Sequence, residues 1–164
     1  MGDDHIISPK IDDDKIIPGL EWLAEQMPGG FFIYKADASR SIVYVNESTC
    51  RMFGCDSTDE FRDLTGFSFN GMVHPDDLDE TLSSIDEQIS DASNNDLDYV
   101  EYRIVRKDGQ VRWVDDRGHY TDNEAYGGIY YVLISDITEK HDKMVQEEKR
   151  AEMEHHRLMK EEQS

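Results

Sequence analysis

The segment 108–140 constrains this chain more than any other, because it joins a tight turn, two strands and a charged helix without interruption. Its Asp108-Gly109 pair predicts a two-residue type I′ hairpin turn, which needs two positions of positive φ. The last predicted strand, 129–135, runs through Asp136-Ile137-Thr138 directly into a helical pattern that continues to the C-terminus. Since no Gly or Pro separates this strand from the helix, strain in the sheet would pass into the helix, as in a sensor joined to an output lever.

The composition favours one acidic domain with helical extensions. The 164 residues are enough for one buried core, and the formal net charge of −20 disfavours nucleic acids and anionic membrane surfaces as partners. No apolar run approaches the ~20 residues of a membrane helix and no signal peptide opens the chain, so we expect a cytoplasmic location. Cys50 and Cys55, the only cysteines, are expected to be reduced packing residues.

Changes in composition divide the chain into four parts. Residues 1–17 predict a flexible acidic tail, and residues 18–28 predict an amphipathic helix with Leu20, Leu23 and Met27 on one face. Residues 29–138 carry the pattern of a globular domain. Residues 139–164 predict a charged helix, which we expect to lead to a further domain.

The globular part predicts an α+β fold. We expect strands at 31–35 and 41–45, helices at 47–53, 57–64 and 75–90, and strands at 97–107, 110–121 and 129–135. A Ser57-x-x-Glu60 capping box opens the second helix, and Pro75 stands at the first position of the third. Five antiparallel strands with the helices grouped on one side form the expected arrangement.

The block 29–140 resembles a PAS domain with its C-terminal PAC half. The segments that carry the resemblance are G-G-F-F-I-Y-K-A-D, I-V-Y-V-N-E, F-G-C, E-F-R-D-L-T-G, M-V-H-P-D-D-L, E-Y-R-I-V-R-K-D-G-Q-V-R-W-V and Y-V-L-I-S-D-I-T-E. Their order and spacing cover about two thirds of the chain. The resemblance implies a five-stranded sensory and dimerisation module, and a bacterial signalling protein with a kinase or cyclase output domain. Asp136, Ile137 and Thr138 would then transmit the signal to the C-terminal helix.

The resemblance does not assign a cofactor. In the flavin photoreceptors of the family a cysteine forms the light-induced adduct, and Phe69 stands at the matching position here. The strand positions that would bond the flavin ring match Ile104, Val114 and Ser135, of which only Ser135 carries a polar side chain. Haem relatives use a histidine of the longer central helix, and residues 75–90 contain none. We therefore expect neither a flavin adduct nor haem, and no metal site.

A small organic ligand or a packed core without ligand both remain open. Strand alternation places Phe32, Tyr34 and Ala36 on the inner face, and Val100, Tyr102 and Ile104 on the same side of the sheet. The candidate pocket comprises Tyr34, Phe53, Phe69, Tyr102, Ile104, Arg112, Val114, Asp116 and Ser135. Arg112 and Asp116 could anchor a ligand, pair with each other or reach solvent at the strand end.

The outer sheet face is predicted to be too apolar to remain uncovered. It would carry Val105, Trp113, Tyr130, Val132 and Ile134 and be covered by the N-terminal helix or by a second protomer. The expected dimer or helix-packing residues are Leu20, Leu23, Met27, Trp113, Val132 and Ile134. The chain would accordingly be a sensor input domain or, alternatively, a ligand-free dimerisation and scaffolding module.

The C-terminal helix is predicted to pair weakly alone. Ile137, Met144, Ala151 and Leu158 recur every seven residues, but the positions four later are polar or charged, so only half of a coiled-coil seam is apolar. No phosphate-binding loop, nucleophile elbow or zinc motif is present, so we expect no catalysis within this chain.

Overall fold

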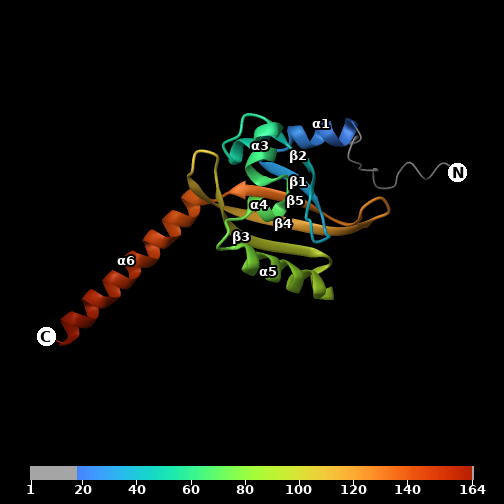
Figure 1. The fold of residues 1–164 in the computed structure, drawn as a ribbon. Helices are drawn as coiled ribbons and strands as arrows, with labels where there is room; N and C mark the ends of the chain where they lie inside the picture. The colour runs from blue at the N-terminus through green and yellow to red at the C-terminus, as the bar shows by residue number, and fades with distance from the viewer. Residues whose placement is uncertain (1–17, 164) are drawn as a thin grey trace.

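The computed structural model describes residues 18–163, without the side chains of residues 18–20. The predicted tail at 1–17 and the side chain of Leu20 therefore lie outside the described residues. Along the chain the elements are α1 (Pro18–Gln26), β1 (Gly30–Lys35), β2 (Ile42–Val45), α2 (Glu47–Met52), α3 (Thr58–Thr65), α4 (Phe69–Met72), α5 (Leu78–Ser90), the 3₁₀ helix η2 (Ala92–Asn94), β3 (Leu97–Val105), β4 (Val111–Asn123), β5 (Gly127–Asp136) and α6 (Thr138–Gln163). This order confirms the α+β fold (Figure 1).

The five strands form one antiparallel sheet in the order β2-β1-β5-β4-β3. The first strand along the chain therefore pairs with the last, and Tyr34 of β1 lies opposite Tyr130 of β5. On its other side β5 pairs with β4, where Val114 lies opposite Asp136. The strand that leads into α6 is thus held between the two halves of the sheet.

The turn between β3 and β4 differs from the expected type I′ turn. The Gly109 N–H donates to the Arg106 C=O at 2.9 Å, and within the Asp108-Gly109 pair only Gly109 has a positive φ, of 86°. The turn therefore spans the four residues 106–109 and places the left-handed conformation only at glycine, where it costs least.

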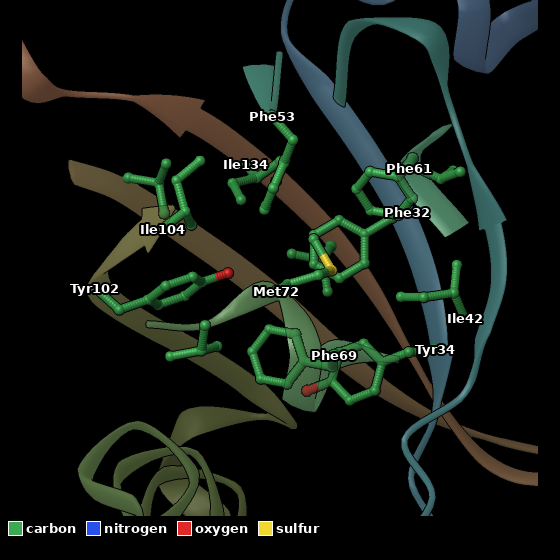
Figure 2. Packing of buried hydrophobic residues seen from close by; sticks show 14 of the residues in the cluster. Phe32, Tyr34, Ile42, Phe53, Phe61, Phe69, Met72, Tyr102, Ile104 and Ile134 are labelled. Carbon is green, nitrogen blue, oxygen red and sulfur yellow. The ribbon is translucent and has the colours of Figure 1, made fainter. Parts of the chain in front are cut away.

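The inner face of the sheet is the face covered by α2, α3, α4 and α5, and it carries the main hydrophobic core (Figure 2). Tyr130, Val132 and Ile134 belong to this face, with 7%, 1% and 2% of their surface exposed. Their expected position on the outer face is wrong. The register explains the error, because Val132 lies opposite Phe32 and paired residues share a face.

The helix α1 packs against the opposite, outer face of the sheet, beside β1 and β2. Ala24 is 1% exposed there, whereas Leu23 is 53% exposed, so Leu23 does not pack against its own domain and its role in a dimer stays a prediction. Buried Asn46 fixes the helix, because its Nδ2 donates to the Ala24 C=O at 2.9 Å while its Oδ1 accepts from the Phe31 N–H at 2.9 Å. Met27, just after the helix, is half-buried.

The predicted helix starts are confirmed for α3 and wrong for α5. The Ser57 Oγ caps α3 by accepting from the Glu60 N–H at 3.1 Å. The helix α5 begins at Leu78, three residues after Pro75. The reason is that the Asp77 carboxylate binds Arg103 of β3 and makes no capping hydrogen bond to its own helix.

The helix α6 projects from the domain as a single helix (Figure 1). Its large apolar side chains are exposed, namely Met144, Met153, Leu158 and Met159. Within residues 18–163, no helix combines the length and the hydrophobicity needed to cross a membrane.

Candidate ligand-binding core and signal junction

Three aromatic rings cross the inner core from β1 toward β3. Tyr34 of β1 stacks on Phe69 of α4, with ring centroids 4.6 Å apart and planes 7° apart. Phe69 in turn meets Tyr102 of β3 edge-on at 5.8 Å. Figure 2 shows Phe69 between the two tyrosines, which enter from opposite sides of the core. The alternation of β1 and β3 thus brings these candidate residues together.

The apolar members of the candidate pocket lie in the same core. Phe53, Ile104 and Val114 are at most 1% exposed, and all three belong to the main cluster. Phe53 closes the core from the end of α2, where its ring meets Phe61 edge-on at 5.2 Å. These positions agree with the strand alternation, while a role in binding a ligand stays a prediction.

Asp116 of β4 is the polar centre of this core. It is 1% exposed, and the Tyr102 hydroxyl donates to its Oδ2 at 2.7 Å. Burial and the neighbouring charge of Asp98 raise the pKa of Asp116 well above its usual value. Burial, then the Asp116 charge, also raise the pKa of Tyr102. The pair can therefore hold a proton inside the domain at neutral pH.

Two predicted pocket residues lie elsewhere. Arg112 sits at the end of the sheet, where its Nε donates to Asp136 Oδ2 at 2.9 Å. Ser135 lies opposite Asp115 in the register and donates to the Asp115 Oδ1. Since Val114 and Asp116 point into the core, Asp115 and Ser135 face outward, and the inward position expected for Ser135 is wrong.

Asp98 is the second buried acid of the core, and it is not among the site residues predicted from the sequence. The alternation that turns Val100, Tyr102 and Ile104 inward also turns Asp98 inward. This alternation is the feature of the sequence that predicts a buried Asp98. Asp98 is 6% exposed, and neither of its carboxylate oxygens accepts a hydrogen bond from any described residue. Burial raises its pKa to about 6.

We call Arg112, Trp113, Asp136, Ile137 and Thr138 the junction, because they join β4 and β5 to α6. The Asp136 Oδ1 accepts from the Thr138 N–H at 2.9 Å and from its hydroxyl at 2.6 Å. The Trp113 N–H donates to Thr138 Oγ1 at 2.8 Å, and the Trp113 C=O accepts from the Ile137 N–H at 2.8 Å. Burial raises the pKa of Asp136, but the bonds from Thr138 and Arg112 outweigh it and lower the pKa overall.

Part of the outer sheet face is not covered by α1. Leu97, Tyr99 and Leu133 are 52%, 42% and 44% exposed and border a shallow hollow of about 790 Å³. Trp113 also lies on this face but is half-buried, because its ring stacks on His141 of α6. The outer face therefore carries an exposed apolar patch, but its residues are not the predicted ones, because Tyr130, Val132 and Ile134 lie in the inner core.

Comparisons with known proteins agree with this architecture. Residues 42–134, more than half of the chain, match the family described as the PAS fold. The methyl sulfide methyltransferase-associated sensor of Methanosarcina acetivorans is 29% identical over 111 residues, which cover 66% of this chain and 10% of that sensor. The chain thus spans about a tenth of the curated relative that it matches.

Solved structures share the fold at low sequence identity. A sensory box histidine kinase/response regulator from Burkholderia thailandensis is 21% identical, with a TM-score of 0.57 and coverage of 77% of this chain and 90% of that one. An RNA-binding light-oxygen-voltage receptor is 22% identical, with a TM-score of 0.61 and coverage of 92% of this chain and 42% of that one.

Proposed function

The chain belongs to the PAS fold family, whose domains are sensor modules of signalling proteins, and from this premise we propose that it is a ligand-binding input domain. A small molecule would bind in the inner core and alter the sheet. The junction would pass the change to α6 and to an output domain beyond it. The domain itself would regulate and not catalyse.

The observation that carries this proposal is the position of the junction relative to the core. Val114 and Asp116 line the core, while Arg112 and Trp113 of the same strand hold Asp136 and Thr138. A shift of β4 by a fraction of an ångström would therefore change the contacts at the start of α6. Packed elements of this kind respond by discrete changes because their interiors are close-packed.

Native mass spectrometry of the purified protein tests the binding step. We expect a co-purified small molecule, or a rise in melting temperature with some member of a metabolite library. An empty mass together with no thermal shift across the library would count against the sensor proposal and in favour of the second candidate below.

A matched pair of variants tests the transmission step. Thr138→Val removes the hydroxyl that accepts from Trp113 while keeping the side-chain volume, and Thr121→Val changes a threonine of β4 away from the junction. With ligand bound, amide exchange in the first turns of α6 should change in the parent and in Thr121→Val. It should change much less in Thr138→Val. Equal changes in all three would remove the junction from the pathway.

The second candidate function is a ligand-free dimerisation and scaffolding module. It is favoured by the exposed Leu97, Tyr99 and Leu133 of the outer face, which a second copy of the chain would cover. In this case self-association would not depend on any small molecule. Sedimentation measured with and without the library hits separates the two functions, because only a sensor would couple association to ligand.

A further inference from the structure

Asp98 and Asp116, which we call the interior acid pair, lie on adjacent strands and on the same face of the sheet. In the register Asp98 is opposite Gly118, and Asp116 is opposite Val100. They are 6% and 1% exposed. Two carboxyl groups are thus removed from water within one core, where burial of charge is costly unless a partner compensates it.

The sequence makes room for the Asp98 carboxylate at Gly118. A Cβ atom at Gly118 would lie 2.5 Å from Asp98 Oδ2 and 3.0 Å from Oδ1. The carboxylate therefore leans across β4 on the inner face, and any larger residue at 118 would displace it. The site is built to hold this group inside the domain.

The protein supplies Asp98 with no compensating partner among the described residues. Its two oxygens accept no hydrogen bond, whereas Asp116 accepts one from Tyr102. Arg40 lowers the pKa of Tyr34 and Tyr130, but its guanidinium donates to the Ala38 C=O. A buried carboxylate without a hydrogen-bond donor or a cation is destabilising, and a bound molecule that supplies either one would remove this cost.

Aromatic side chains lie near the interior acid pair. Tyr34 and Tyr130 stack with ring centroids 4.8 Å apart, and Tyr120 meets Tyr130 edge-on at 5.4 Å. Burial, and then nearby charges that include Asp98, raise the pKa of Tyr34 and of Tyr130, so the Asp98 carboxylate lies within electrostatic range of both side chains. Because Tyr34 stacks on Phe69 as well as on Tyr130, the carboxylates and not the ring faces would hold an ammonium group, through ion pairing and charge-assisted hydrogen bonds.

Accordingly, and resting on the sensor function proposed above, we propose that the interior acid pair recognises a small organic ammonium ion in the core of this domain. Asp98 supplies the charge that the cation neutralises. Asp116, held by Tyr102, supplies a second acceptor. Neutral and anionic molecules of the same size are rejected, because they leave the carboxylate of Asp98 uncompensated.

The proposal predicts a dependence on pH. The groups that face Asp98 are Asp116 of β4 and the tyrosines Tyr102, Tyr34 and Tyr130 of β3, β1 and β5, while Asp86 of α5 acts on Tyr130. Asp98 itself has a pKa of about 6, because burial disfavours its charged form. Binding of a permanently charged ammonium ion is therefore strongest above pH 6 and weakens below it.

Thermal denaturation with three probes tests the proposal. Ethylammonium, trimethylammonium and choline chlorides are compared with propanol, with sodium propionate and with sodium chloride at equal ionic strength. At about one hundred times its Kd, a bound probe raises the melting temperature by about 5 to 10 °C. The choline titration is repeated at pH 5 and pH 8, since the charge of choline does not change between them.

Three variants separate a specific site from a general effect of charge. Asp98→Asn and Asp116→Asn remove one carboxylate each, whereas Asp115→Asn removes a buried carboxylate that faces outward beside Ser135. Asp98→Asn should abolish the shift, Asp116→Asn should reduce it and Asp115→Asn should keep it. Since Asn is nearly isosteric with Asp, all three variants are expected to fold, and far-ultraviolet circular dichroism confirms this.

The outcomes distinguish this proposal from the sensor function. No shift with any ammonium probe, or an equal shift in Asp98→Asn, overturns the ammonium site. A shift with propanol or propionate that Asp98→Asn leaves intact also overturns it, yet supports a ligand-binding core. A shift with ammonium ions alone, lost in Asp98→Asn and kept in Asp115→Asn, supports both.

Discussion

Trp113 and His141 stack face to face, with ring centroids 4.1 Å apart and planes 18° apart. Trp113 belongs to β4 and His141 to the first turns of α6, so the stack adds a side-chain contact to the backbone hydrogen bonds of the junction. The Arg103 guanidinium lies 5.8 Å from the Trp113 ring and also binds Asp77, before α5. A continuous set of contacts therefore runs from the start of α5 to α6.

His141→Ala should loosen the start of α6. The stack is worth about 0.5–1.5 kcal/mol beyond the area it buries. Losing it should speed amide exchange in the first two turns of α6 by about 2- to 12-fold, because 1.4 kcal/mol corresponds to a factor of ten. Hydrogen exchange followed by mass spectrometry measures this change.

The control for this change is His156→Ala, which removes an exposed histidine further along the same helix. It should leave exchange at the start of α6 unchanged. If both variants exchange alike, the stack on Trp113 contributes nothing to the position of the helix.

Gly118→Ala should destabilise the domain through one contact. The added methyl group would meet the Asp98 carboxylate at 2.5 Å, and all three of the nearest atoms belong to Asp98. Overpacking of this kind costs about 1–3 kcal/mol. In an Asp98→Ala background the same change should cost less than about 0.5 kcal/mol. Urea denaturation of the four proteins gives the coupling, and additive effects would show that the clash is relieved elsewhere.

The fold could be predicted from strand alternation and from turn and cap residues. The inward positions of Phe32, Tyr34, Tyr102 and Val114 follow from period-two patterns, and the register confirms them. The Ser57 cap of α3 is visible from the sequence because it uses residues only three positions apart. Local signals of this kind need no knowledge of distant partners.

The predictions from the sequence fail where residues far apart in the chain determine the local structure. The inner face of β5 depends on its register with β1, which the pattern of one strand cannot reveal, so the sequence predicts the wrong faces for Val132 and Ser135. Asp77 follows the pattern of a helix start, yet Arg103, 26 positions away, takes its carboxylate. Asp98 stands at an inward-facing position in the alternation of β3. The sequence does not single it out, because an acid at the start of a strand is usually solvated.

Asp98→Asn should stabilise the unliganded domain at high pH. Burial raises the pKa of Asp98 to about 6 from about 3.9 in the unfolded chain, so the folded state holds the proton more tightly. The cost of the charged form is absent below about pH 4 and complete above about pH 6, where it approaches ~3 kcal/mol. The gain from Asp98→Asn should therefore grow as the pH rises between these limits.

Urea denaturation between pH 4.5 and pH 8 measures the difference between Asp98→Asn and the parent. Using the difference cancels the general repulsion of a chain with a net charge of −20. Asp115→Asn, which changes a buried acid of the outer face that accepts from Ser135, is the matched control. A gain that is equal at pH 4.5 and pH 8 would mean that the pKa of Asp98 is the same in the folded and the unfolded chain.

Tyr102→Phe should destabilise the domain by removing the hydroxyl that donates to Asp116. A buried acceptor left unpaired costs about 1–3 kcal/mol. Because Asp116 is 1% exposed, water is not at hand to replace the lost bond. Tyr99→Phe, which alters a partly exposed tyrosine of the same strand, is the matched control and should cost less than about 1 kcal/mol. Equal losses in urea denaturation would contradict the assigned importance of the buried pair.

Under the second candidate function, in which copies of the chain pair through the outer face, Leu133→Gln should weaken self-association. Leu133 is 44% exposed beside Leu97 and Tyr99, and a second copy that covers this patch would bury it. Because each protomer carries a net charge of −20, added salt should strengthen association by screening the repulsion between copies. Analytical ultracentrifugation at about 50 and 500 mM salt measures both effects. Leu158→Gln, on exposed α6, is the comparison: if it dissociates the protein and Leu133→Gln does not, the helix holds the dimer and the sheet face does not.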